Sequence, residues 1–345
     1  MSRIVLGLGG GDCAAPSSVR SAARPQPSPL DPVCPLSPDV PVPMSDEIIC
    51  IGELLWDALP AGLFLGGAPF NVACHLHALG HPAAVASRVG DDVLGREALR
   101  RLRARGLDDA LVQVDDARPT GFVRVDLTAA DDPDYDIVAP AAWDGLARTA
   151  ALEARVADAT ALVFGSLAQR AVPARDTIRA LAGTDVRCVF DVNLRAPYDD
   201  RAVVAPSLRL ADVVKLNEEE LARLGRWFDL PDAPADAMAA LARSFDCSAV
   251  CVTAGAEGAR LWQAGTHVRH PGHPTTVTDT VGAGDAFLAA LLSGLLAGHN
   301  GDTLLDRANR LGAFVAAHDG AVPAYEVDGL DALRTLSPPA APTDA

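Results

Sequence analysis

Short apolar runs recur along the chain, and amphipathic stretches separate them. The runs at residues 48–51, 161–165, 187–190, 213–216 and 250–253 are apolar at nearly every position, as in strands covered on both faces. A helical pattern follows the second of them, near residues 174–182. Alternating strands and helices predict an α/β fold, a doubly wound, mostly parallel sheet flanked by helices, with ligands at the carboxyl ends of its strands.

One region departs from this alternation. Apolar and polar side chains alternate with period two over residues 120–127, as in a strand with one exposed face. Residues 135–138 form a similar run, so we predict a hairpin across residues 129–134. The alternative is that this hairpin has no role in function.

The two ends of the chain differ in composition from its middle. Residues 1–43 are rich in Pro, Ser, Ala and Gly and lack periodicity, which predicts a disordered extension. Met44 immediately precedes the first strand and could be the true start. A signal or transit peptide is the alternative, but there is no continuous apolar segment, and Asp12 and Asp31 are present. We expect a folded domain at 44–336 and a disordered tail at 337–345.

Charge and hydropathy exclude several classes of partner. The 345 residues carry a formal net charge of −16, which disfavours nucleic acid and anionic membrane surfaces. No apolar run reaches the roughly 18 residues of a membrane span. The longest candidate, residues 286–297, is better explained as a buried helix.

Cysteine and histidine usage gives no sign of a disulfide framework or a metal centre. The seven cysteines are odd in number and lie mostly in apolar strands, which predicts reduced thiols in a cytoplasmic protein. His267, His270 and His273 are interleaved with Pro and Gly. We interpret them as an exposed turn, because no acid or thiol completes a ligand set.

The strongest chemical signal is the segment Asp-Thr-Val-Gly-Ala-Gly-Asp at 279–285, which runs into an apolar helix. The amides of Gly282, Ala283 and Gly284, together with the helix dipole, would form a cradle for an anion such as phosphate. Asp285 would lie beside a reacting phosphoryl group and could act as a base. The alternative is ordinary helix capping. A P-loop and a dinucleotide fingerprint are both absent, which disfavours a dehydrogenase.

A second segment, Gly-Gly-Ala-Pro-Phe-Asn-Val-Ala at 66–73, also leads into a helix. The pair fits G-G-x-x-x-N-x-A and D-T-x-G-A-G-D, the signatures of the ribokinase-like, or phosphofructokinase B type, carbohydrate kinases. The chain resembles this family from about residue 46 to 328. Smaller matches lie at residues 52–57, 89–95, 191–195, 217–220 and 252–259.

The resemblance implies a ribokinase-like fold with a small β lid, from about 59–65 and 119–140, and a possible homodimer through the lid. It implies an ATP-dependent kinase acting on a primary hydroxyl of a small sugar. The chain is most similar to bacterial fructokinases, but ribokinases, 2-keto-3-deoxygluconate kinases and nucleoside kinases share both signatures. A non-catalytic sugar- or nucleotide-binding regulator is the alternative of another class. It is disfavoured because Asp285 and the Gly-Ala-Gly turn are retained.

Each site residue implied by the family is named by its position in this sequence. Asp285 would be the general base, with Gly282, Ala283 and Gly284 as the anion hole. The sugar would contact Asp57, Gly67, Asn71, Arg195 and Asp285. ATP would lie against Asn217, Glu220, Thr253, Gly255, Gly258, Gly282, Gly284 and Asn309. Asn217 and Glu220 would orient Mg²⁺ through water, and Asp279, Val281 and Gly320 would hold a K⁺ ion.

Overall fold

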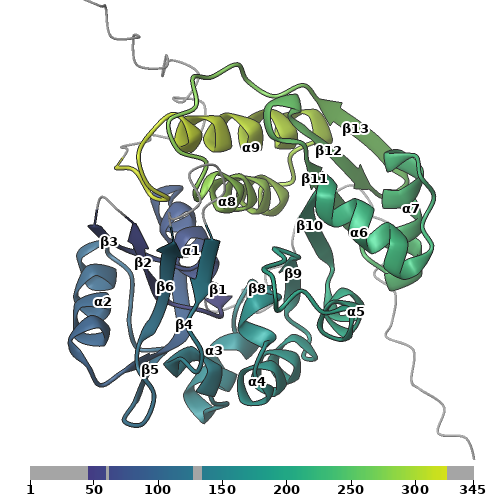
Figure 1. The fold of residues 1–345 in the computed structure, drawn as a ribbon. Coiled ribbons are helices and arrows are strands. Elements are labelled where there is room, and N and C mark those ends of the chain that lie inside the picture. Colours follow the sequence, from purple (N-terminus) through teal and green to yellow (C-terminus); the bar gives the residue numbers. More distant parts are fainter. Residues whose placement is uncertain (1–45, 60–61, 127–133, 325–345) are drawn as a thin grey trace, which may run out of the picture. The chain divides into compact units, whose positions relative to one another are not determined.

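A large mixed sheet organises the part of the chain that the computed structural model describes, residues 46–59, 62–126 and 134–324 (Figure 1). Nine strands lie in the order β13-β12-β11-β10-β9-β8-β1-β4-β5 among these residues. The parallel strands are β1 (Ile48–Ile51), β4 (Ala83–Gly90), β5 (Val112–Asp115), β8 (Ala161–Gly165), β9 (Arg187–Asp191), β10 (Val213–Asn217) and β11 (Ala249–Thr253). The predicted doubly wound sheet is therefore confirmed.

Two antiparallel strands at one edge of the sheet were not predicted. β12 (Ala259–Gln263) pairs with β11, and β13 (Thr266–His270) pairs with β12. The interpretation of the histidine segment as a turn is wrong for His267 and His270, which lie in β13. Most positions of β13 are exposed or half-buried, so this edge strand lacks the apolar run that marks a central strand.

Helices cover both faces of the sheet, and alternate strand residues contact the two layers. Ile48 and Cys50 belong to one core cluster, and Ile49 and Ile51 to the other. The first cluster includes α1 (Ala68–Ala78), α2 (Val93–Ala104), α8 (Ala283–Leu296) and α9 (Gly301–Ala316). The second includes α3 (Ala150–Ala157), α4 (Val172–Ala182), α5 (Arg201–Leu210), α6 (Glu218–Phe228) and α7 (Pro234–Phe245).

A second, smaller sheet has the strand order β3-β2-β6-β7. It consists of β2 (Leu55–Leu59), β3 (Gly62–Gly66), β6 (Gly121–Asp126) and β7 (Asp134–Ile137). The predicted pairing of the hairpin strands is confirmed, with Val123 opposite Ile137. The lid segment predicted from about 59–65 overlaps β3, which pairs with β2 in the antiparallel direction. The predicted extension at 1–43, the tail at 337–345 and most of the hairpin loop lie outside the described residues.

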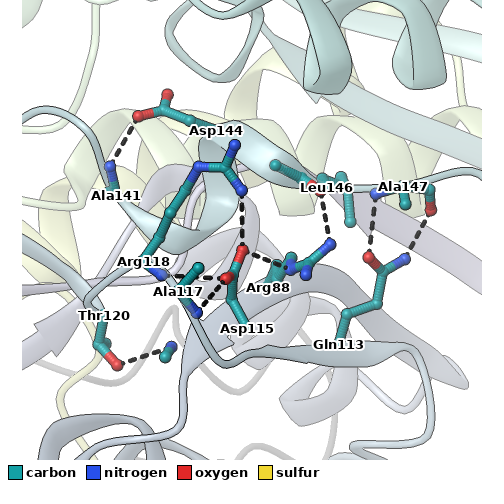
Figure 2. A network of polar contacts seen from close by, with 12 residues as sticks. Arg88, Gln113, Asp115, Ala117, Arg118, Thr120, Ala141, Asp144, Leu146 and Ala147 are labelled. Atoms are coloured by element: carbon teal, nitrogen blue, oxygen red, sulfur yellow. Dashed lines mark hydrogen bonds and ion pairs between the residues drawn. The ribbon is translucent and has the colours of Figure 1, made fainter.

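A buried acid fixes the path from the main sheet to the second one. Figure 2 shows Asp115, at the end of β5, between Arg88 of β4 and Arg118. Its Oδ2 atom lies 2.9 Å from Arg88 Nε, and its Oδ1 atom accepts the N–H groups of Ala117 and Arg118. Burial alone would raise the pKa of Asp115, but these donors and the two guanidinium groups lower it. The turn that leads to β6 is therefore held by the buried Asp115 carboxylate, whose charge is balanced by the two arginines.

Two further predictions concern the described residues as a whole. The five cysteines among them, at positions 50, 74, 188, 247 and 251, are buried, as expected of core thiols. Within the same residues, no helix has both the length and the apolar character needed to cross a bilayer.

Candidate active site

The N-terminus of α8 carries a set of unpaired amide donors. In the described part of the chain, the N–H groups of Gly282, Gly284 and Asp285 have no hydrogen-bond partner. The N–H group of Ala283 donates to Thr280 O at 3.2 Å, which removes the predicted contribution of Ala283 to the anion hole. The positive end of the helix dipole adds to the free donors, so this end of α8 is suited to bind an anion.

The turn before α8 has a conformation that requires glycine. Gly282 is the N-cap residue, with a φ of 78°. A Cβ atom at this position would lie 2.5 Å from Ala321 Cα, so the turn packs directly against the 320–323 loop. Backbone packing at Gly282 therefore fixes the direction of the free amides.

Asp285 connects the two signature segments. Its Oδ2 atom accepts a hydrogen bond of 2.8 Å from Asn71 Nδ2 of α1, which is 214 positions away in the sequence. Burial and the nearby Asp191 carboxylate raise the pKa of Asp285 to about 6, against the lowering effects of Lys215, Asn71 and Arg195. A carboxylate with this pKa is ionised at neutral pH and is a stronger base than an exposed aspartate.

Three of the predicted sugar-binding residues, Asp57, Gly67 and Asn71, lie on β2 and at the start of α1, and Arg195 follows β9. Asp57 is on β2, and burial raises its pKa to about 6 while Arg195 lowers it. Gly67 is the N-cap of α1 with a φ of 109°, and a Cβ atom there would meet Glu53 O at 2.4 Å. Arg195 is exposed and donates to the Leu194 carbonyl group. Its charge lowers the pKa of Asp57, Glu53 and Asp285, so it lies close to all three acids.

Glu53 is a site residue that the sequence analysis missed. It is 3% exposed, and its Oε1 atom accepts the Ala68 N–H group at 3.3 Å. Among the described residues, its Oε2 atom has no hydrogen-bond partner, and neither has Asn71 Oδ1. Burial, with a contribution from Asp285, raises the pKa of Glu53 to about 7. Unpartnered buried acceptors next to Asp285 indicate a place where a hydroxylated ligand supplies the missing donors.

Asn217 and Glu220 form a reciprocal capping box at the start of α6. Asn217 Oδ1 accepts the Glu220 N–H group, and Glu220 Oε2 accepts the Asn217 N–H group. Glu220 Oε1 accepts the Leu194 N–H group at 2.7 Å. Each oxygen of this buried carboxylate therefore already accepts one N–H group. A contact through a water molecule on the ion is compatible with the remaining lone pairs.

The predicted nucleotide residues Thr253, Gly255 and Gly258 lie at the end of β11 and just after it, and Asn309 lies in α9. Thr253 is next to Asn217 in the register of these strands. Gly258 has a φ of 82°, and a Cβ atom there would lie 2.1 Å from His270 O, so only glycine fits. Gly255 also has a positive φ, but its surroundings are open. Asn309 is buried in α9, and its amide donates to Leu305 O of the same helix at 2.7 Å.

The three residues predicted to bind K⁺ are brought together by Asp279. Its Oδ1 atom accepts the Val281 N–H group at 2.9 Å, and its Oδ2 atom accepts the Gly320 N–H group at 3.1 Å. This bridge joins the turn before α8 to the 320–323 loop. Both oxygens of Asp279 accept backbone N–H groups there, and a carboxylate is an oxygen ligand of the kind that hard cations prefer.

The histidine segment has an acid partner that the sequence did not reveal. Asp306 of α9 lies 3.1 Å from His273 Nε2 and 3.5 Å from His270 Nε2. However, the Gly272 N–H group donates to His270 Nδ1, so in neutral His270 the proton is on Nε2 and faces Asp306. Arg310 also pairs with Asp306, at 2.8 Å. This cluster is satisfied by its own hydrogen bonds.

The fold and the anion-binding turn of α8 indicate a phosphotransferase. Comparison with known proteins identifies its family. The family model for pfkB family carbohydrate kinases matches residues 53–327. The chain therefore belongs to the pfkB family of carbohydrate kinases.

Relatives of the chain include enzymes from bacteria and archaea. It is 32% identical to the fructokinase of Klebsiella pneumoniae over 268 residues, which cover 74% of this chain and 86% of the relative. A sugar kinase from Pyrococcus horikoshii, solved in complex with ATP, is 28% identical with a TM-score of 0.67, covering 80% of this chain and 94% of the other. A fructokinase double mutant from Vibrio cholerae, bound to fructose, ADP and potassium ion, is 27% identical with a TM-score of 0.69, covering 84% and 98%.

Proposed function

We propose that this sugar kinase transfers the γ-phosphoryl group of ATP to a primary hydroxyl group of fructose. The observation that carries the proposal is the Asn71–Asp285 hydrogen bond, which puts both family signatures at the free amides of α8. Relatives named fructokinase, one of them solved with fructose and ADP, support fructose as the acceptor. ATP, as in the Pyrococcus complex, supplies the phosphoryl group.

The reaction follows from the arrangement of these groups. The sugar hydroxyl oxygen forms a bond to the γ-phosphorus, the bond from that phosphorus to the bridging oxygen breaks, and ADP leaves. Asp285 accepts the hydroxyl proton. The free N–H groups of Gly282 and Gly284 stabilise the negative charge on the transferred group. Asp57, Asn71, Gly67 and Glu53 orient the hydroxyl groups of the sugar.

The predicted cations have separate roles. When bound to the ATP phosphates, Mg²⁺ would supply charge neutralisation. Asn217 and Glu220 would contact the water molecules of that ion, since the Glu220 oxygens already accept two N–H groups. Asp279, Val281 and Gly320 would hold K⁺ beside the α8 turn, consistent with the potassium ion in the Vibrio structure. The predicted homodimer through the second sheet remains a proposal, which the exposed Leu63 and Phe64 of β3 support.

The substrate is tested by ADP release with ATP and Mg²⁺ against fructose, ribose, 2-keto-3-deoxygluconate and adenosine. We expect the highest kcat/KM with fructose. A preference for another compound of the panel would leave the kinase assignment unchanged and identify a different acceptor. ATP binding without turnover on any compound would instead favour a non-catalytic regulator that binds sugar or nucleotide.

The pH dependence tests the state of Asp285. Because burial raises its pKa to about 6, its base form is lost below that pH, and kcat/KM should fall about tenfold per unit there. Rates from pH 5 to 8 at saturating ATP measure this limb. Glu53→Gln serves as a control because the pKa of Glu53, about 7, lies in the same range. The limb should persist near pH 6 in this variant, and a wild-type rate that stays constant down to pH 5 would contradict the prediction.

A further inference from the structure

Lys215 is the single lysine of the chain, and it is buried behind the anion cradle. It lies in the middle of β10 and is 7% exposed. A methyl group placed on Gly284 would lie 3.1 Å from Lys215 Nζ, so the ammonium group directly adjoins the first turn of α8. No sequence motif assigned this residue a role.

The lysine is held in place by a neighbouring strand. Asp191 of β9 is its partner in the register of the sheet, and both Asp191 oxygens lie 3.1 Å from Nζ. Burial lowers the pKa of Lys215, but the charges of Asp191, Glu220 and Asp285 raise it by more. The side chain is therefore a permanent cation at the floor of the site.

A structural ion pair is the simplest alternative explanation. However, a buried pair contributes little to stability compared with apolar side chains of similar volume. The position of the Lys215–Asp191 pair also favours a role in the reaction, because the pair lies next to the helix turn whose free amides would face the phosphoryl group. The acids around it exceed the cations, so ATP would enter a site with an excess of negative charge without Lys215.

We infer that Lys215 is an electrostatic positioning residue for phosphoryl transfer, whose ammonium group, fixed by Asp191, balances the charge that gathers at the α8 N-terminus. The inference rests on the proposed transfer at this turn, with Asp285 as base. Lys215 acts through the field at Gly284 and Asp285. Its removal should therefore affect the transfer step more than the binding of the sugar.

The first test compares Lys215→Met with the double variant Lys215→Met/Asp191→Asn, using the sugar of the panel that the wild type phosphorylates. Lys215→Met alone leaves the Asp191 carboxylate buried and unpaired, so it can unfold the chain. The double variant removes both charges and should keep a wild-type Tm. We expect kcat of Lys215→Met to fall about tenfold with the sugar KM unchanged, less than the 10²–10³-fold cost of losing a direct oxyanion donor. The double variant, in which the opposite effects of the two charges are both gone, should recover most of this loss.

The pH profile separates an electrostatic role from a merely structural one. Lys215 lowers the pKa of Asp285 and Asp191 raises it. The acid limb of kcat/KM should therefore move to higher pH in Lys215→Met and to lower pH in Asp191→Asn. Glu53 also titrates in this range, but neither Lys215 nor Asp191 contributes to its shift. The pKa of Asp285 is shifted by Asp191, Lys215, Asn71 and Arg195. Asp285 in turn raises the pKa of Glu53 and of Cys50.

Two outcomes would overturn the inference. One is a Lys215→Met variant that folds with a wild-type Tm and keeps wild-type kcat, which would make the pair structural. The other is an acid limb that stays in place in both single variants. Since every rate is compared with an active wild type, either result leaves the kinase assignment standing, whereas failure of the proposed function would appear as an inactive wild type.

Discussion

Replacing Asp285 by asparagine should lower kcat about 10²–10⁴-fold, the usual range for loss of a general base. Asparagine has nearly the same size, and its Oδ1 atom can still accept the Asn71 amide, so the contact between α1 and α8 should survive. It cannot accept the proton of the attacking hydroxyl group. We therefore expect the sugar KM to change little. Steady-state ADP release measures both constants.

The matched control for this change is Asp302→Asn. Asp302 is also in the first turn of a neighbouring helix, α9, and is exposed. Its loss removes the same helix-terminal charge without touching the site, so kcat should stay within about twofold of wild type, since such a charge contributes less than about 1 kcal/mol at the surface. Full activity of Asp285→Asn would mean that another group accepts the proton.

Gly282→Ala should lower kcat about 10²–10³-fold, the cost of losing an oxyanion-hole donor. The φ of 78° disfavours any Cβ atom, and here the Cβ would lie 2.5 Å from Ala321 Cα. Either the turn or the 320–323 loop must move. The free N–H groups of Gly282 and Gly284 would then no longer converge on one point, and the Asp279 bridge between the two segments would be strained.

Gly298→Ala is the control at the other end of α8. Its φ of 71° is also positive, but no atom lies within 4 Å of the added methyl group. This variant carries the conformational cost alone, about 1–2 kcal/mol, and should lower Tm while leaving kcat intact. If Gly282→Ala and Gly298→Ala lose the same stability and both keep kcat, the turn is not a catalytic element.

The central strands were predictable because their signal is local. β1, β8 and β11 are short, continuous apolar runs, as expected of strands that are buried on both faces of a sheet. Ala259–Gln263 and Thr266–His270 include arginine, tryptophan and histidine. Their pairing with β11 depends on the end of the sheet being open there. That condition belongs to the tertiary fold and is not encoded in either segment.

The site residues also divide into those that the sequence predicts and those that it does not. Asp285, Asn71 and Gly282 belong to recognisable turns, and the structure brings these turns together. Glu53 could not be predicted, because its importance lies in burial and in an oxygen without a partner. Sequence also could not show that Asn309 bonds to its own helix, or that Asp306 lies beside the histidines. These contacts depend on distances between elements that are remote in the chain.

The Asn71–Asp285 contact also bears on how the enzyme is made. A chain is synthesised from its N-terminus, and domains of this size commonly fold through intermediates. α1 leaves the ribosome long before α8, yet the acid-bearing turn of α8 must also pack against Ala321. Closing a loop of this length is slow compared with forming local helices. Enzymatic activity should therefore be among the last properties that a nascent chain acquires, and a ribosome-stalled chain ending before Ala321 should be inactive even if its sheet has formed.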